Sequence, residues 1–155
     1  MKTQFLLPFK FKKAGLYMLP LFVIMACIEV FGNESLTQSI WVLPLPSIFN
    51  DGSLNDSSWF TIVTDSIYNE IWVIGILLSL SFIALAREKE EDEMISKIRL
   101  ESMAWALWAI LILFAFETLF IFGFSYMEFT FLTLFIYLLL FIFKFNYEMY
   151  KVRKN

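Results

Sequence analysis

Four glutamates are the residues of this sequence whose type and spacing could support chemistry. They are Glu29, Glu70, Glu117 and Glu128, and each falls in a different long apolar stretch or at its edge. An ionisable side chain within a membrane is costly, and it commonly marks a water-filled cavity or an ion path. The four carboxylates are therefore a candidate site for a cation or a proton.

Glu117 is the deepest of the four. On a continuous helix it lies roughly 24 Å from Glu101, at ~1.5 Å per residue, and its face carries small residues that favour close helix packing. A second interpretation stays open. Glu29, Glu70 and Glu128 are then hydrated at the membrane interface, while Glu117 is protonated or hydrogen-bonded to a nearby hydroxyl.

The composition removes several kinds of chemistry. The chain has no His, so it cannot by itself build a His-ligated metal site, a bis-His haem site or a His-dependent catalytic relay. Its single cysteine, Cys27, excludes an internal disulfide, and the scattered glycines form no phosphate-binding loop. We expect no catalytic residues, no resident metal, no cofactor and no enzymatic activity.

Four apolar stretches must position the carboxylates. With 59% hydrophobic and 17% charged residues, the chain has more apolar surface than a soluble domain of this size can bury. Each stretch reaches the ~20 residues that cross a ~30 Å hydrocarbon core. We predict an all-α polytopic membrane domain over residues 1–155, with spans at residues 14–31, 67–86, 102–123 and 126–145. Residues 29–32 make a poor cleavage site, so the first stretch is expected to stay as a span.

The basic residues predict the orientation. All twelve Lys and Arg residues lie in three groups: near the start of the chain, in residues 87–99, and from Lys144 at the end of the fourth span onward. Two spans separate each group from the next. Cytoplasmic loops carry such an excess. Both termini and a linker at residues 87–101 are therefore placed in the cytoplasm, and a loop at residues 33–66 outside. The net charge of −3 gives no support for direct nucleic-acid binding.

The linker is the most distinctive string of the chain. As a helical hairpin it would place oppositely charged residues four apart and give an apolar stripe along one face. It is either a solvated charged face or an acidic docking surface for a cytoplasmic partner. The candidate docking residues are Glu90, Glu91, Asp92, Glu93, Met94, Ile95 and Ile98.

The outer loop has two parts. Residues 36–49 are too apolar for a free aqueous loop and too short and proline-broken to span, so we expect them on the membrane surface or capping the bundle. The second span is expected to begin at an N-cap, Thr64 or Asp65.

The linker also carries a family resemblance. The string of residues 87–102, the aromatic-rich span after it and the ending Phe143-Lys-Phe-Asn-Tyr147 resemble a group of small four-helix inner-membrane proteins of Bacteroidota such as flavobacteria. Members of that group often stand beside a small helix-turn-helix regulator. The resemblance implies a membrane sensor or a sequestering partner, and it implies no biochemical activity.

These features favour a non-enzymatic membrane protein that serves as a sensor, a regulatory partner or an accessory subunit of a membrane complex. Its expected partners are the lipid bilayer and another protein, either a membrane complex, a cytoplasmic regulator or a second copy of the chain. The alternative is a cation- or proton-linked transport element that uses Glu117 and the other outer carboxylates.

Overall fold

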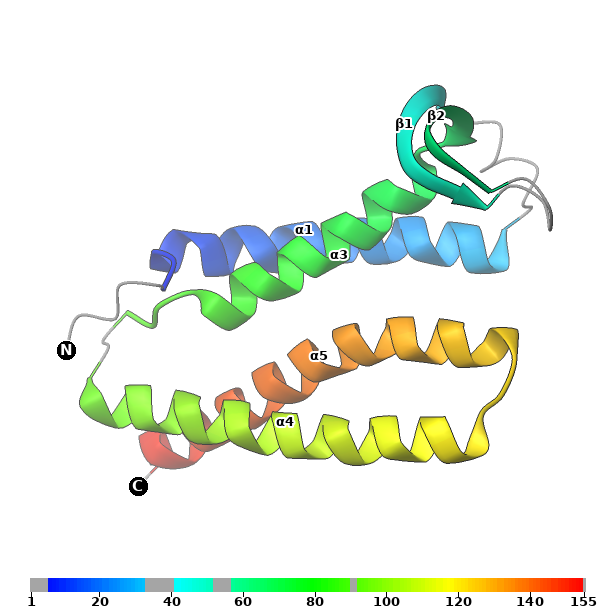
Figure 1. Ribbon diagram of the computed structural model, residues 1–155. Coiled ribbons are helices and arrows are strands. Elements are labelled where there is room, and N and C mark those ends of the chain that lie inside the picture. Colours follow the sequence, from blue (N-terminus) through cyan, green and yellow to red (C-terminus); the bar gives the residue numbers. More distant parts are fainter. Residues whose placement is uncertain (1–5, 33–40, 52–56, 90–91, 155) are drawn as a thin grey trace. The chain divides into compact units, whose positions relative to one another are not determined.

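The computed structural model describes residues 6–32, 41–51, 57–89 and 92–154. These residues form four helices and two strands (Figure 1): α1 (Phe9–Phe31), β1 (Val42–Asp51), β2 (Ser57–Ser66), α3 (Tyr68–Leu85), α4 (Glu93–Phe120) and α5 (Phe124–Lys154). All four helices are long and apolar enough to cross a membrane. The chain is thus mostly helical, as predicted, and each predicted span overlaps one helix.

Three helices extend beyond the predicted spans, and α1 does so by beginning at Phe9 rather than at residue 14. Asp92 caps α4, because its side chain accepts a 2.7 Å hydrogen bond from the Glu93 amide. The charged residues after that cap therefore continue into the apolar span as one helix. At the other end, α5 runs to Lys154, and a 2.7 Å contact between Lys144 and Glu148 supports its last turns. That hydrogen bond holds the pKa of the Glu148 carboxyl below its usual value.

The chain divides into two compact units, Met18–Ile76 and Met1–Tyr17 with Leu77–Asn155. The helices α1 and α3 each pass from one unit into the other.

The smaller unit contains a β-hairpin that the all-α prediction lacked. In it, β1 and β2 are antiparallel, with Val42 opposite Ser66. The expected N-caps were wrong for the same reason, since Thr64 and Asp65 lie in β2 and α3 begins only at Tyr68. The run of aromatic and β-branched residues before α3 suits a strand.

Two prolines in β1 do not prevent this pairing. Pro44 and Pro46 are two residues apart, so their backbone nitrogens, which carry no hydrogen, face the same edge of the strand. A two-stranded sheet leaves one edge of each strand without a partner strand, and proline is tolerated there.

The larger unit is built on α4 and α5, which lie side by side (Figure 1). Gly123 makes the short connection with φ +78°, a conformation that suits glycine. A cluster of buried side chains from α3, α4 and α5 forms the core. Its members are Ala84, Ile98, Ala106, Phe141, Phe145 and Met149.

Most of the helical surface lies outside that core. Only 6% of the most apolar stretch of α1 is buried, and 11% of those of α4 and α5. Apolar surface of this extent must be shielded from water, and the hydrocarbon core of a membrane would shield it.

Candidate functional site

Glu117 is buried within the larger unit. Its side chain is 2% exposed, and both of its carboxyl oxygens lie within hydrogen-bond distance of the Thr133 hydroxyl on α5, at 2.8 and 2.9 Å. The same hydroxyl also lies 3.0 Å from the carbonyl oxygen of Phe129. Glu117 therefore joins α4 to α5 through a single threonine.

The Thr133 hydroxyl has two acceptors within reach. A hydroxyl has one hydrogen, so Thr133 donates either to the Glu117 carboxyl group or to the Phe129 carbonyl at any one time. The Thr133 hydroxyl is thus the donor through which Glu117 contacts α5.

The other three predicted carboxylates have different surroundings. Glu29 is partly exposed and accepts a 2.7 Å hydrogen bond from the indole N–H of Trp72, within the smaller unit. Glu70 and Glu128 are exposed. Within the described residues, no group of three His, Cys, Asp or Glu side chains could hold a metal ion. The ion-site assignment thus stays a prediction.

The predicted docking residues that the structure describes are partly buried in the core and partly exposed. Ile98 belongs to the core, and Ile95 packs against it. Glu93 and Met94 are exposed, and Asp92 is exposed and caps α4. Glu90 and Glu91 lie outside the described residues. The apolar stripe is therefore divided between internal packing and the surface.

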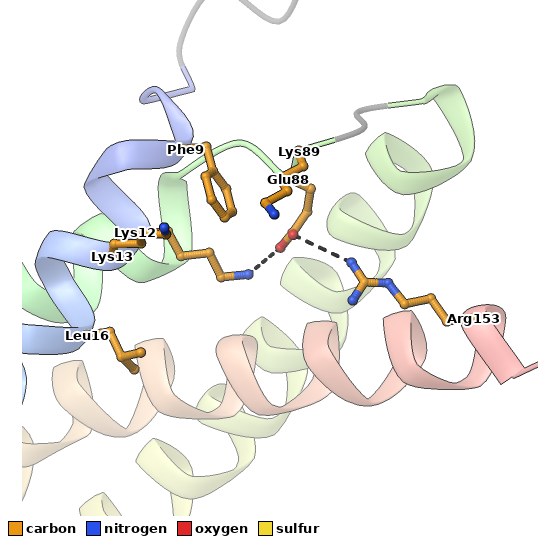
Figure 2. Close-up of a pocket in the computed structure, with 7 residues that line it drawn as sticks. All are labelled: Phe9, Lys12, Lys13, Leu16, Glu88, Lys89 and Arg153. Carbon is orange, nitrogen blue, oxygen red and sulfur yellow. Dashed lines mark hydrogen bonds and ion pairs between the residues drawn. The ribbon is translucent and has the colours of Figure 1, made fainter.

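A polar network around Glu88 is the feature that sequence reasoning missed. The Glu88 side chain is 9% exposed and pairs with Lys12 of α1 through one oxygen, while its other oxygen lies 3.9 Å from Arg153 of α5 (Figure 2). Backbone pairing of Leu7 with the end of α3 and the residues just after it holds this segment in place: the Leu7 N–H donates a 3.0 Å bond to the Leu85 carbonyl, and the Arg87 N–H donates a 2.8 Å bond to the Leu7 carbonyl. One carboxylate thus links three separate parts of the chain.

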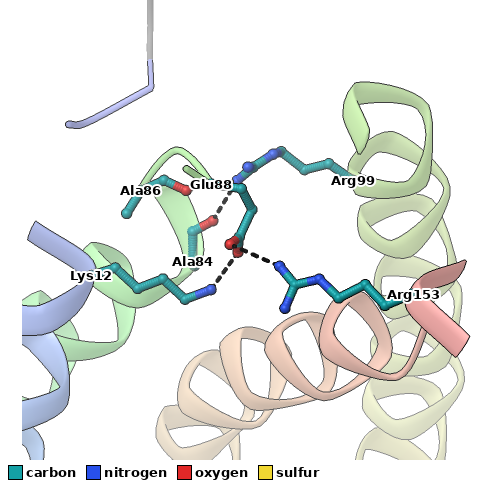
Figure 3. A network of polar contacts seen from close by, with 6 residues as sticks. All are labelled: Lys12, Ala84, Ala86, Glu88, Arg99 and Arg153. Carbon is teal, nitrogen blue, oxygen red and sulfur yellow. Dashed lines mark hydrogen bonds and ion pairs between the residues drawn. The ribbon is translucent and has the colours of Figure 1, made fainter. Parts of the chain in front are cut away.

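Arg99 is the second part of this network. It is 7% exposed, and its Nη1 donates 3.2 Å hydrogen bonds to the carbonyl oxygens of Ala84 and Ala86, at the end of α3 (Figure 3). Its guanidinium carbon lies 4.8 Å from the centre of the Phe145 ring. Carbonyl groups at a helix C-terminus carry partial negative charge, so the cation is well matched to this position.

One sequence signal could have identified Arg99 as buried. It lies three, seven and eleven residues before Ser102, Ala106 and Ile110, which places all four on one helical face. The other charged residues near the start of α4 lie on different faces of the helix. No comparable signal marks Glu88, because its partners come from α1 and α5.

Comparison with protein-family models, with curated proteins and with solved structures found no match to the chain.

Proposed function

We propose that this chain is a non-enzymatic integral membrane protein that acts by binding another protein, as a regulatory partner, sensor or accessory subunit. The observation that carries the proposal is a pair of exposed apolar side chains on α4 before the predicted span. Met94 is 52% and Leu100 is 70% exposed there, among the charged side chains of Glu93, Lys97 and Glu101. Large apolar side chains in a charged aqueous segment are typical of a protein interface.

The charge of the segment favours one kind of partner. The linker carries more acidic than basic residues, so a partner with a basic rim around an apolar centre would complement it. The resemblance to the Bacteroidota membrane proteins supports the same proposal, since it implies a cytoplasmic regulator nearby. We place the protein in a bacterial inner membrane, with both termini and this segment on the cytoplasmic side. The distribution of the basic residues supports that orientation.

The test is affinity purification in mild detergent with two matched double variants. Met94→Ala with Leu100→Ala should reduce the yield of a stoichiometric partner at least roughly tenfold, the loss typical of removing interface anchors. Leu107→Ala with Leu111→Ala removes two side chains of similar exposure, 51% and 50%, from the apolar part of the same helix and should not reduce it. Equal losses in both variants, or no stoichiometric partner in the wild type, would argue against the proposal.

A second candidate function, cation- or proton-linked transport, is supported by the burial of Glu117. An ionisable group inside a membrane bundle is a functional candidate by default. In proteoliposomes, Glu117→Gln should then abolish ion-dependent or proton-dependent flux while the protein remains folded. Unchanged flux, or no flux in the wild type, would leave Glu117 with a structural role.

A further inference from the structure

A cavity of ≈ 340 Å³ opens beside the Glu88 network, and all of its lining residues belong to the larger unit. Figure 2 shows their origins: α1 contributes several side chains, α5 contributes Arg153, and the segment after α3 contributes the others. The full lining is Phe9, Lys12, Lys13, Leu16, Glu88, Lys89 and Arg153.

The lining is strongly basic. Four cations against one carboxylate leave a net charge of +3. Glu88 is engaged with Lys12 and Arg153, whereas Lys13 and Lys89 are exposed and lie 6.0 and 5.7 Å from the centre of the same Phe9 ring. Two ammonium groups held around one ring create a local positive potential that a bound anion would relieve.

The wall of the cavity is not only basic. Phe9 and Leu16 supply apolar surface, and Leu16 and its neighbour Tyr17 are 62% and 79% exposed along α1. Lys12 and Lys13 immediately precede the first predicted span, which begins at residue 14. A ligand with an anionic head and an apolar tail would therefore find cations at the predicted membrane surface and apolar helix surface next to them. Basic pockets at this depth commonly bind anionic lipid headgroups.

We propose that this cavity binds the phosphate headgroup of an anionic phospholipid from the cytoplasmic leaflet. The proposal rests on the membrane insertion and orientation proposed above. Lys13 and Lys89 contact the phosphate, Glu88 holds Lys12 and Arg153 at the edge of the site, and the acyl chains lie along α1 beside Leu16.

The experiment measures lipid retained by the full chain in a neutral detergent, by native mass spectrometry. The probes are dioleoylphosphatidylglycerol, dioleoylphosphatidylcholine and inorganic phosphate as a competitor. The test variant is Lys13→Gln with Lys89→Gln, and the matched control is Lys10→Gln with Lys97→Gln. The control removes the same charge from two exposed lysines of the same predicted side that are not part of the cavity lining.

The wild type should retain phosphatidylglycerol in preference to phosphatidylcholine, and inorganic phosphate should not displace it. The test variant should lose that preference by roughly tenfold or more, as expected for two basic contacts near a lipid headgroup. The control should stay within about twofold of the wild type.

Three results would overturn the proposal. Equal losses in the two variants would indicate diffuse attraction, equal retention of both lipids would exclude a headgroup site, and displacement by phosphate would assign the cavity to a free anion. Alkaline carbonate extraction of the membranes tests insertion separately. If the wild type is extracted, the proposed membrane function fails; if it stays and the lipid preference is absent, only the lipid site fails.

Discussion

Arg99 illustrates how a charge in an apolar protein can be structural. The guanidinium group offers several N–H donors in a flat arrangement, which suits two backbone carbonyls and an aromatic ring at once. Those carbonyls, on Ala84 and Ala86, close α3, and the ring belongs to Phe145 of α5. A single side chain on α4 therefore connects the end of α3 with α5.

We predict that Arg99→Met lowers the free energy of unfolding by about 2–3 kcal/mol, because it removes charge-assisted hydrogen bonds from buried carbonyl groups. Arg99→Lys should recover only part of the loss, since an ammonium group has no planar surface to lie against the Phe145 ring. The measurement is SDS-driven unfolding of the purified protein. Lys97→Met is the control, because Lys97 is exposed and its ion pair with Glu101 is 4.0 Å long, so the expected change is within about 0.5 kcal/mol. An equal cost for both substitutions would contradict the structural role of Arg99.

Gly15 is a second residue whose environment dictates its type. A Cβ atom there would lie 2.6 Å from the backbone oxygen of Ser79 and 3.0 Å from side-chain atoms of Phe82 and Ile83. Backbone atoms of a packed helix cannot move aside cheaply, so α1 and α3 approach each other closely only because position 15 has no side chain.

Gly15→Ala should therefore destabilise the protein by about 1–3 kcal/mol, the usual cost of overpacking. The shift in thermal midpoint in detergent would measure it. Cys27→Ala on the same helix is the control: Cys27 is exposed, and its replacement should leave the midpoint nearly unchanged. A tolerated Gly15→Ala would show that this approach is looser than the structure indicates.

At the level of elements, the sequence predicted the helices well and the hairpin poorly. Long apolar stretches determine helices locally, because a backbone in lipid must satisfy its own hydrogen bonds. The hairpin was missed because the prolines at 44 and 46 counted only as evidence against a span, although two prolines on one edge are compatible with a strand. The position of a partner on a distant element, as for Glu88, is absent from local patterns.

The inward position of Glu117 on α4 was predicted from the sequence, but its contact with α5 was not. The sequence placed Glu117 on an inward face and left two interpretations open, an ion site or a carboxyl bonded to a hydroxyl. Glu117 is buried beside the Thr133 hydroxyl, which supplies the bonded hydroxyl of the second interpretation, and the ion site stays a prediction. The identity of the hydroxyl was not available from the sequence, because it depends on the register between α4 and α5.

A double-mutant cycle should measure this contact. Thr133→Val should cost up to ~1.7 kcal/mol, the upper end for hydrogen bonds between helices in membranes, with an average near ~0.6 kcal/mol. Glu117→Gln should cost less than ~1 kcal/mol, since an amide can still donate to and accept from Thr133. Unfolding in SDS gives both values and the double variant. Additive effects of the two substitutions would show that the side chains are not coupled.

For the whole molecule, the three basic groups of the sequence meet in the larger unit. Lys12, Lys89 and Arg153 come from the first, second and third groups, and all three line the same cavity. The prediction from charge alone places the two termini and the linker in one compartment, and it would put all three of these segments on one side of the membrane.

Cysteine labelling in intact cells tests that topology. Cys27 is first replaced by Ser, so that an introduced cysteine is the only thiol in the chain. A cysteine at position 53, in the predicted outer loop, should react with a membrane-impermeant maleimide, whereas Ser96→Cys in the linker should react only after the cells are permeabilised. The expected contrast follows from the cost of moving the basic groups across the membrane. Labelling of position 96 in sealed cells would reverse the orientation. It would also remove the proposed lipid site from the cytoplasmic leaflet, because Lys89 lies in the same linker.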